Sequence, residues 1–416
     1  MTTERGRAGR WLVALLALLL WQVAPAAPAA APTAPGARVQ LGISVLLHDR
    51  LDLVRGKNVG LITNPTGVNR DLVSDVALLA HAPGVHLVAL FGPEQGFRGA
   101  AQAGATVKSF RDPETGLPVY SLYGKTHAPT PAMLKGINVL VFDMQSVGAR
   151  FYTYLYTMAD CMQAAAKAHI PFIVLDRPNP LGGLAVQGPV LEPKFASFIG
   201  EYPIALRYGM TTGELAELFN RQFHIGADLT VVKMRGWKRS MYYADTGLPF
   251  VLPSPNIPTE TTALVYPGMG LIEGTNVSEG RGTTLPFQLT GAPWIRASAL
   301  AAKLNALHLP GVRFRPAHFV PTFSKYTGKL CNGIEVFVTD RTAFNPVIVG
   351  LNVIATIHAM YPRQFKFLEA HFDGMVGNDW IRRDIEAGVP VAQMVARWQP
   401  GLARFKAIRA KYLLYP

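Results

Sequence analysis

Cysteine is scarce in this chain: only two of its 416 residues are cysteines, which excludes a small scaffold held together by disulfide bridges. Hydrophobic residues make up 49% of the chain and charged residues 16%, a balance typical of globular proteins and not of disordered ones. Beyond the first forty residues there is no low-complexity block and no Gly-x-y period, which excludes collagen-like and linker-dominated architectures. We therefore expect a folded chain with a sizeable core. Cys161 and Cys331 could pair in an oxidising compartment, and two buried free thiols are the alternative.

Several motifs of cofactor-dependent and metal-dependent enzymes are also missing. No Gly-x-Gly-x-x-Gly opens a helix, and the phosphate-binding pattern Gly-x-x-x-x-Gly-Lys-Ser/Thr is absent, so neither a dinucleotide nor ATP is implied. The ten histidines show no His-x-x-x-His or His-Glu-x-x-His spacing, so we expect no metal site. A serine hydrolase is disfavoured because neither Gly-x-Ser-x-Gly nor Ser-x-x-Lys occurs. The sequence thus predicts a protein without a cofactor.

The one long apolar run lies near the N-terminus. Arginines within the first ten residues precede an almost purely apolar stretch from Trp11 to Val23, and the small residues Ala24-Pro25-Ala26 follow. This order is typical of a secretory signal peptide, with cleavage expected after Ala26, and an uncleaved anchor is the alternative. No later run is long enough to cross a bilayer. We therefore expect an exported protein, periplasmic or secreted, without stable membrane insertion after signal cleavage.

Basic residues outnumber acidic ones, with 40 Lys and Arg against 27 Asp and Glu and a formal net charge of +13. Such a charge favours anionic partners. The basic residues are scattered and match no zinc-finger or RNA-binding signature, so we expect no nucleic acid. Peptidoglycan, whose muramic acid carries a lactyl carboxylate, is compatible with the charge, although charge alone does not select it.

Short, continuous apolar runs alternate with helix-like segments in the first half of the chain. Continuous hydrophobicity marks strands buried on both faces, and the intervening helices favour a doubly wound parallel sheet. Strands are expected at residues 59–63, 85–91, 139–142 and 171–175, and helices at 72–80, 131–135 and 152–169.

The pattern changes beyond residue 200. A Thr-x-x-Glu capping pattern at Thr211 to Glu214 opens one predicted helix. We expect an α/β protein in which a Rossmann-like doubly wound parallel sheet domain (38–290) follows the signal peptide (1–26) and precedes a smaller C-terminal α/β domain (291–416). Helices are expected at 210–219, 297–307, 347–360 and 391–405, and strands at 229–234 and 333–339.

Polar residues follow each predicted strand of the first half. In open parallel sheets ligands bind beyond the carboxyl ends of the strands, so these segments are candidates for a binding site. They read Thr63-Asn64-Pro65-Thr66-Gly67, Gly92-Pro93-Glu94-Gln95-Gly96-Phe97-Arg98-Gly99, Asp143-Met144-Gln145-Ser146-Val147-Gly148-Ala149-Arg150-Phe151-Tyr152 and Asp176-Arg177-Pro178-Asn179-Pro180.

A further polar motif lies later in the chain and reads Glu273-Gly274-Thr275-Asn276-Val277-Ser278. With this motif and three of the segments above, the chain resembles the NamZ family of exo-β-N-acetylmuramidases from about Val39 to Pro416. The three segments begin at Gly92, Asp143 and Asp176. The resemblance implies a two-domain glycoside hydrolase with an active-site cleft between its domains. It also implies removal of terminal N-acetylmuramic acid from the non-reducing ends of peptidoglycan fragments.

Glycoside hydrolysis needs a proton donor and a second group, which is a carboxylate or the 2-acetamido group of the substrate. Glu94 is the best candidate for the acid, because it ends a strand beside an aromatic residue that would raise its pKa by desolvation. A loop glutamate that caps a helix is the alternative, and the resemblance favours the acid. Asp143 and Glu273 are the other catalytic candidates, and Asp143 could instead orient an arginine. Retaining, inverting and substrate-assisted mechanisms all stay open.

Arginine is the expected ligand of the lactyl carboxylate, because a guanidinium pairs with a carboxylate in a bidentate manner. Asparagine side chains are suited to hydroxyl and amide groups, and Tyr152 could stack on a sugar or belong to the core. The predicted substrate-binding residues are Asn64, Arg98, Gln145, Arg150, Tyr152, Asp176, Arg177, Asn179, Asn276 and Arg281.

Three positions depart from the family pattern. Pro65 and Gln95 stand where the family usually has His, and Ser146 stands where it usually has Asp. The rival hypothesis is therefore an exported, non-catalytic protein that binds muramyl sugars or peptidoglycan through a degenerate site. The presence of Glu94 favours the enzyme, because a protein that only binds sugar needs no carboxylic acid beside the glycosidic oxygen.

Overall fold

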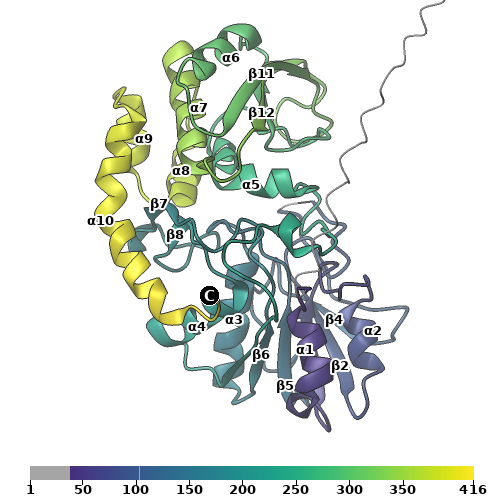
Figure 1. Ribbon diagram of the computed structural model, residues 1–416. Helices are drawn as coiled ribbons and strands as arrows, with labels where there is room; N and C mark the ends of the chain where they lie inside the picture. Colours follow the sequence, from purple (N-terminus) through teal and green to yellow (C-terminus); the bar gives the residue numbers. More distant parts are fainter. Residues whose placement is uncertain (1–37, 103) are drawn as a thin grey trace, which may run out of the picture. The chain divides into compact units, whose positions relative to one another are not determined.

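The computed structural model describes residues 38–102 and 104–416, and the predicted signal peptide with its cleavage site lies outside these ranges. The first half of the chain is built on a seven-stranded sheet with the order β3-β4-β2-β1-β5-β6-β9 (Figure 1). Every neighbouring pair is parallel except β3 with β4. The strands are β1 (Asn58–Thr63), β2 (His86–Gly92), β3 (Phe110–Arg111), β4 (Pro118–Ser121), β5 (Val139–Asp143), β6 (Phe172–Leu175) and β9 (Leu229–Val232).

Helices cover both faces of this sheet, which confirms the interpretation of the continuous apolar runs. On β5, Val139 and Val141 join the hydrophobic cluster under α1 (Gly42–Asp49) and α2 (Asp75–Ala80). Leu140 and Phe142 of the same strand join a larger cluster that includes α3 and α4. Side chains alternate along a strand, so one apolar run supplies both layers. The helices on the second face are α3 (Tyr154–Lys167) and α4 (Thr212–Gln222).

The predicted capping pattern at the start of α4 is confirmed. The Thr211 hydroxyl accepts a hydrogen bond from the backbone N–H of Glu214 at 3.2 Å, and the Glu214 carboxylate accepts one from the N–H of Thr211 at 3.0 Å. This reciprocal pair satisfies two N–H groups that have no partner within the helix. It fixes where α4 begins, beside the end of β6.

The second half contains an antiparallel sheet with the order β10-β12-β11 and a short pair, β7 with β8. The long helix α10 packs against β7 and α7, and the turn of 3-10 helix that follows it, η5 (Ala410–Tyr412), meets α4 (Figure 1). The bounds are β7 (Gln187–Val190), β8 (Ala205–Arg207), β10 (Leu289–Ala292), β11 (Val312–Phe319), β12 (Cys331–Val338), α5 (Glu260–Met269), η4 (Gly270–Gly274), α6 (Ala297–Asn305), α7 (Pro346–Met360), α8 (Glu369–Val376), α9 (Trp380–Glu386) and α10 (Val391–Arg409).

The structure corrects some of the predicted elements. Residues 131–135 form a series of turns and not a helix, because the segment is short and Gly136 ends it with a φ of 80°. The helix expected from Leu72 begins at Asp75, since Leu72 has a φ of 63° that no helix accepts. The domain boundary after residue 290, a position within β10, stays a prediction.

The two cysteines lie in different elements, and Cys161 is inside a helix that the sequence predicts. Cys161 is in α3 and Cys331 begins β12, and both are buried free thiols, so they form no disulfide bridge with each other. In the part of the chain that the structure describes, no helix is both long enough and apolar enough to span a membrane.

Candidate active site

A cavity of about 250 Å³ lies among the loop after β2, the segment before α3, α5 with η4, and the start of α8. Its walls combine carboxylates, phenols and a guanidinium, a set suited to a polar ligand such as a sugar. The residues that carry this chemistry are Glu94, Tyr152, Tyr266, Glu273, Arg281 and His371.

Glu94 is held by a tight turn at the end of β2. Gln95, the next residue, has a φ of 66°, which is unusual for a residue other than glycine, and the N–H of Gly96 donates to the carbonyl of Pro93 at 2.9 Å. The Glu94 carboxylate accepts hydrogen bonds from the Thr153 hydroxyl at 2.7 Å and from the N–H of Gly104 at 3.0 Å. Strained backbone of this kind occurs often at functional sites, where it fixes a side chain.

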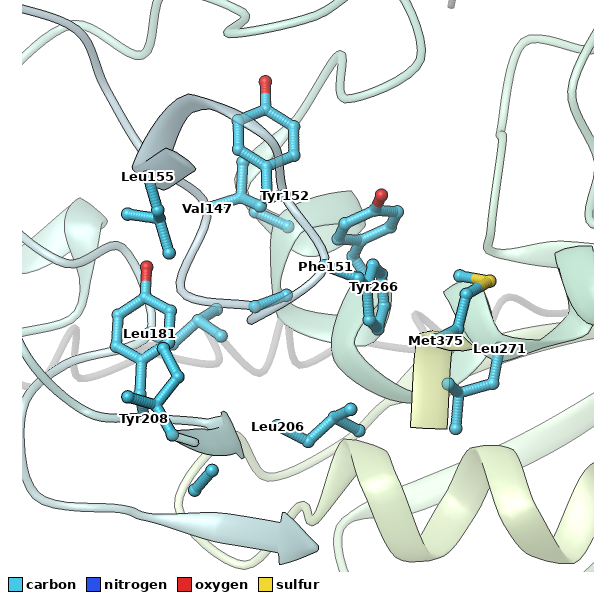
Figure 2. Packing of buried hydrophobic residues seen from close by; sticks show 14 of the residues in the cluster. Val147, Phe151, Tyr152, Leu155, Leu181, Leu206, Tyr208, Tyr266, Leu271 and Met375 are labelled. Carbon is cyan, nitrogen blue, oxygen red and sulfur yellow. The ribbon is translucent and has the colours of Figure 1, made fainter. Parts of the chain in front are cut away.

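Two of the tyrosines that line the cavity are neighbours. Tyr152 and Tyr266 lie side by side with perpendicular rings 6.2 Å apart, and Figure 2 shows their hydroxyls pointing in the same direction. Burial raises the pKa of both phenols, and the nearby Glu94 carboxylate raises the pKa values further. The phenols therefore stay protonated at neutral pH and can donate hydrogen bonds to a ligand.

Glu273 lies on η4 and forms an ion pair with Arg281. The Nε of Arg281 donates to Oε1 of Glu273 at 2.8 Å, and the guanidinium lies over the ring of Phe287, 5.0 Å from its centre. Burial raises the pKa of the Glu273 carboxyl, Arg281 lowers it, and the neighbouring Glu279 raises it, so that the pKa lies above its ordinary value. The Glu273 and Glu94 carboxylates both raise the pKa of the Tyr266 phenol.

His371 is a further titratable residue of the cavity and lies next to Glu273. Its Nε2 lies 4.0 Å from Oε2 of Glu273. Burial lowers the pKa of His371, and Lys325 lowers it further, so the imidazole is neutral at neutral pH.

The cavity therefore presents two carboxylates in unlike surroundings. Glu94 is oriented by a hydroxyl and a backbone N–H, whereas Glu273 is oriented by a guanidinium. Pairs of carboxyl groups whose environments differ in this way divide acid and base roles between them. Across residues 38–102 and 104–416, no group of three or more His, Cys, Asp or Glu side chains is arranged to hold a metal ion.

Two predicted acidic residues lie away from the cavity. Asp143 is buried and forms an ion pair with Arg177, whose Nη2 also donates to the carbonyl of Val68 at 2.9 Å. Asp176 accepts hydrogen bonds from the Thr211 hydroxyl at 2.8 Å and from the N–H of Gly213 at 2.7 Å. Asp143, Asp176 and Arg177 thus connect the strand ends and the start of α4.

Four further predicted residues also bind the protein backbone. Arg150 is fully buried and donates to the carbonyls of residues 189 and 204 from β7 and the segment before β8, and to that of residue 375 in α8. Gln145 donates to two backbone carbonyls at 2.8 Å, and Asn179 donates to the carbonyl of residue 210 at 2.8 Å. Asn276 donates to the carbonyl of residue 364 at 2.8 Å and accepts from the N–H of residue 366 at 2.9 Å. None of these four lines the cavity.

The remaining predicted residues, Asn64 and Arg98, line a separate hollow of about 270 Å³ together with Pro65. Arg98 forms ion pairs there with Asp112 at 2.6 Å and Glu114 at 3.2 Å. This hollow shares no residue with the cavity that holds Glu94.

The three departures from the family pattern lie in different places. Gln95 lines the cavity and accepts a hydrogen bond from the Tyr154 hydroxyl at 2.8 Å. Pro65 lines the separate hollow, and Ser146 is buried against the Tyr208 hydroxyl at 2.8 Å. Only the change at Gln95 therefore alters the wall of the cavity.

Sequence reasoning missed Tyr266 and His371. Tyr266 sits in a helix that carries Pro267 and Gly268, and nothing in that run distinguishes a cavity tyrosine from a core one. His371 belongs to a short helix that the sequence analysis did not assign. His371 lies close to Glu273 only in the folded chain, so its place at the cavity has no counterpart in the sequence.

Two family models match the chain. The model described as "Exo-beta-N-acetylmuramidase NamZ, N-terminal" matches residues 59–261, and "Exo-beta-N-acetylmuramidase NamZ, C-terminal" matches residues 264–415. Among curated proteins, "Peptidoglycan beta-N-acetylmuramidase NamZ" of Bacillus subtilis (strain 168) is 58% identical over 379 residues, which cover 91% of this chain and 92% of that protein.

Two crystal structures of DUF1343 family proteins from Bacteroides fragilis NCTC 9343 share the fold. One has a TM-score of 0.85 and 41% sequence identity, covering 91% of this chain and 99% of the other. The second has a TM-score of 0.72 and 31% identity, again covering 91% of this chain and 99% of the other. The mixed α/β arrangement, with a mostly parallel sheet followed by smaller sheets, is therefore common to all three.

Proposed function

The chain belongs to the NamZ family of exo-β-N-acetylmuramidases, which are glycoside hydrolases, and on this premise we propose that it removes terminal N-acetylmuramic acid from the non-reducing ends of peptidoglycan fragments. The observation that carries the proposal is that Glu94 and Glu273 line one cavity. Glu94 belongs to the part matched by the N-terminal family model, and Glu273 to the part matched by the C-terminal one. An active-site cleft between a Rossmann-like domain and a smaller C-terminal domain is part of the proposal.

Glu94 is the general acid of the proposed reaction. The bond between the anomeric carbon and the glycosidic oxygen breaks, and the Glu94 proton passes to that oxygen. Water supplies the hydroxyl of the released sugar, and the remaining proton of that water passes to a carboxylate of the cavity. The Thr153 hydroxyl beside Glu94 can donate or accept, so it holds the carboxyl in both protonation states. The turn at Gln95 fixes the direction of the side chain.

Glu273 is the second group of the proposed mechanism. Its carboxylate, oriented by Arg281, stabilises the positive charge that develops at the anomeric carbon. Arg281 and Lys325 favour this ionised form, whereas burial and Glu279 raise the pKa of the carboxyl. The role is the same in outline whether Glu273 acts on water, on the anomeric carbon, or on the acetamido group of the substrate.

Arg281 is assigned to the lactyl carboxylate of the substrate. Of the four arginines that the motifs contain, Arg98, Arg150 and Arg177 have their contacts elsewhere, and Arg281 lines the cavity. Its Nε and Nη2 contact Glu273, and its Nη1 has no hydrogen-bond partner in the described part of the chain. We assign the hydroxyls of Tyr152 and Tyr266 to polar groups of the sugar ring.

The export of the protein is a further part of the proposal. It rests on the arginine-rich, apolar and small-residue order of the first 26 residues. Peptidoglycan is a polymer of the cell envelope, so an exported hydrolase would meet its substrate there.

The test is to incubate the purified protein with the disaccharide N-acetylmuramyl-β-1,4-N-acetylglucosamine and to follow free N-acetylmuramic acid by mass spectrometry. Release is the expected result. Binding of the disaccharide in a calorimeter without any release would overturn the proposal and favour the non-catalytic sugar-binding protein. A longer glycan distinguishes the mode of attack, because an exo-acting enzyme releases only the terminal sugar at early times.

A further inference from the structure

A second hollow, of about 370 Å³, adjoins the proposed catalytic cavity and shares Glu273 and Arg281 with it. Its other wall includes Phe323, Ser324 and Lys325, which belong to the loop between β11 and β12. This loop comes from a distant part of the sequence and reaches the back of η4, where Glu273 lies. Contacts between this loop and η4 can therefore determine the position of the Glu273 side chain.

Lys325 makes an unusually full set of contacts for a lysine. Its ammonium donates to the backbone carbonyls of residues 272, 273 and 277, at 3.2, 3.1 and 3.0 Å. It also lies 3.0 Å from the Glu279 carboxylate, which is only 2% exposed. An ammonium has three donors, so these four acceptors fully occupy it. Lys325 thus ties together η4 and the segment that leads to Arg281.

The backbone on both sides of Lys325 is strained. Ser324 has a φ of 71° and Tyr326 a φ of 58°, a region that residues other than glycine seldom enter. The loop also lies close to the Arg281 turn: the N–H of Thr322 donates to the carbonyl of Gly282 at 2.9 Å, and a Cβ on Gly282 would lie only 2.7 Å from the N of Phe323. Such strain persists only where the surrounding contacts enforce it.

The charges of this cluster balance. Two cations, Arg281 and Lys325, face two carboxylates, Glu273 and Glu279, within a partly buried network. Without Lys325, the Glu279 carboxylate would keep the Ser324 hydroxyl at 3.4 Å and a single cation, the Arg281 guanidinium, whose Nε is 3.6 Å away. It would then compete with Glu273 for that guanidinium.

We propose that Lys325 is a positioning residue of the hydrolase, which fixes η4 and Glu279 and thereby holds the Glu273–Arg281 pair at the catalytic cavity. The inference rests on the proposed role of Glu273. Lys325 does not line that cavity, so it acts through the residues that do. It also favours the ionised form of Glu273, so its removal raises the pKa of that carboxyl.

The test compares Lys325→Met with Lys325→Arg and with the control Lys329→Met, which changes an exposed lysine of the same loop. Lys325→Met is expected to lower kcat/KM by about 10-fold to 100-fold, mainly through kcat, because a small misplacement of a catalytic group is that costly. The limb of the pH profile that follows ionisation of Glu273 is expected to move to higher pH. Lys325→Arg is expected to restore part of the rate, and Lys329→Met to match the wild type.

A second variant covers the case in which Lys325→Met leaves a buried carboxylate without a partner and fails to fold. The double variant Lys325→Met/Glu279→Gln removes both charges. It is expected to fold, and the pH limb that follows Glu273 is expected to lie above that of Glu279→Gln, because Lys325 acts on Glu273 directly. Its kcat is still expected to fall below that of Glu279→Gln, because the three backbone carbonyls have lost their donor.

Hydrogen exchange of residues 270–282 without substrate supplies a readout that does not depend on activity. Exchange is expected to be faster in Lys325→Met, or in the double variant relative to Glu279→Gln, than in Lys329→Met. If the wild type releases no sugar, the proposed function fails, and hydrogen exchange still decides whether Lys325 holds η4. A folded Lys325→Met variant with the wild-type kcat, pH profile and exchange would overturn the inference.

Discussion

At the residue scale, the two carboxylates of the cavity have different partners, and this difference sets what each can do. Glu94 is held by a hydroxyl and a backbone N–H, while Glu273 faces the positive charge of Arg281. Arg281 favours the ionised form of Glu273, and burial favours the neutral form. The guanidinium therefore controls the pH at which Glu273 becomes charged.

The substitution Arg281→Gln tests this control. Loss of the guanidinium leaves burial and Glu279, which raise the pKa of the Glu273 carboxyl, opposed by Lys325, so the pKa rises and the ionised fraction at a given pH falls. We expect the acid limb of the kcat/KM profile to move up by about one pH unit or more, since an opposite charge shifts a carboxyl pKa by about that amount. The measurement is a pH–rate profile. Arg98→Gln is the matched control, because its ion pairs lie in the separate hollow. An unmoved limb in Arg281→Gln would contradict the account.

The sequence identified Glu94, Tyr152, Glu273 and Arg281 as candidates, and the structure brings these four to one cavity. Polar residues at the ends of strands have the same sequence signature whether they face a ligand or hold the strands together. Asp143, for example, is the last residue of β5, and Glu94 comes two residues after β2, yet the partner of Asp143 is the buried guanidinium of Arg177. Which partner a side chain meets depends on the folded chain, and the sequence does not contain that information in a local pattern.

At the scale of elements, α5 and α7 cross at two glycines. A Cβ on Gly268 would overlap the carbonyl oxygen of Pro346, and a Cβ on Gly350 would overlap the carbonyl oxygen of Gly268. The two helices can approach this closely only because neither residue has a side chain. The crossing fixes the end of α5, and η4 with Glu273 follows directly.

The substitution Gly268→Ala is therefore expected to destabilise the protein. Overpacking of this kind costs about 1–3 kcal/mol or more, because backbone and not a flexible side chain must move. The change is measured as the free energy of unfolding in a denaturant titration. Gly374→Ala is the control: this glycine also lies inside a helix, but the nearest atom to its Cβ, Cδ1 of Ile199, is 3.9 Å away. Alanine should be neutral or stabilising there. Equal stability of Gly268→Ala and the wild type would contradict the proposed crossing.

The elements that the sequence predicted correctly are those with a continuous apolar pattern. The four buried strands of the first half and the helix α3 are examples, because burial on both faces or along one face leaves a clear pattern. Two of the missed elements have residues that disfavour the secondary structure they form. Helix α5 contains Pro267 and Gly268, which usually break helices, and β11 is a half-exposed strand with arginines at positions 313 and 315. Tertiary packing decides these cases.

At the scale of the whole molecule, the last residues of the chain return to the first sheet. The Tyr415 hydroxyl donates to the Asp176 carboxylate at 2.5 Å and accepts from the N–H of Met234 at 2.9 Å. The N–H of Leu414 donates to the Glu214 carboxylate at 2.7 Å. Asp176, at the end of β6, thus connects the C-terminal residues with the start of α4.

This junction makes the stability of the protein depend on pH. Burial raises the pKa of Asp176 to about 7, although hydrogen bonds from Tyr415 and Gly213 work against the rise. In the unfolded chain the pKa of an aspartic acid is about 3.9. Between these values the folded state holds a proton that the unfolded state has lost, so the contribution of Asp176 to stability is full below pH 4 and is lost as the pH rises toward 7.

The variant Asp176→Asn isolates this contribution. We expect the difference in unfolding free energy between the wild type and the variant to change between pH 4 and pH 7, with the wild type losing stability relative to the variant as the pH rises. The measurement is denaturant unfolding at several pH values. A difference that stays constant over this range would show that Asp176 does not titrate there.

Glu94 is the proposed proton donor of an exo-muramidase, and Glu94→Gln tests this role most directly. Glutamine keeps an oxygen that accepts from the N–H of Gly104, and its NH2 group can donate to the Thr153 hydroxyl, so the variant should fold as the wild type does, with an unchanged melting temperature. Release of N-acetylmuramic acid from the disaccharide, followed by mass spectrometry, is expected to fall by about 10²-fold to 10⁴-fold, the usual contribution of a general acid. Glu114→Gln, at an exposed side chain outside the cavity, is expected to keep full activity. Wild-type turnover by Glu94→Gln would contradict the account.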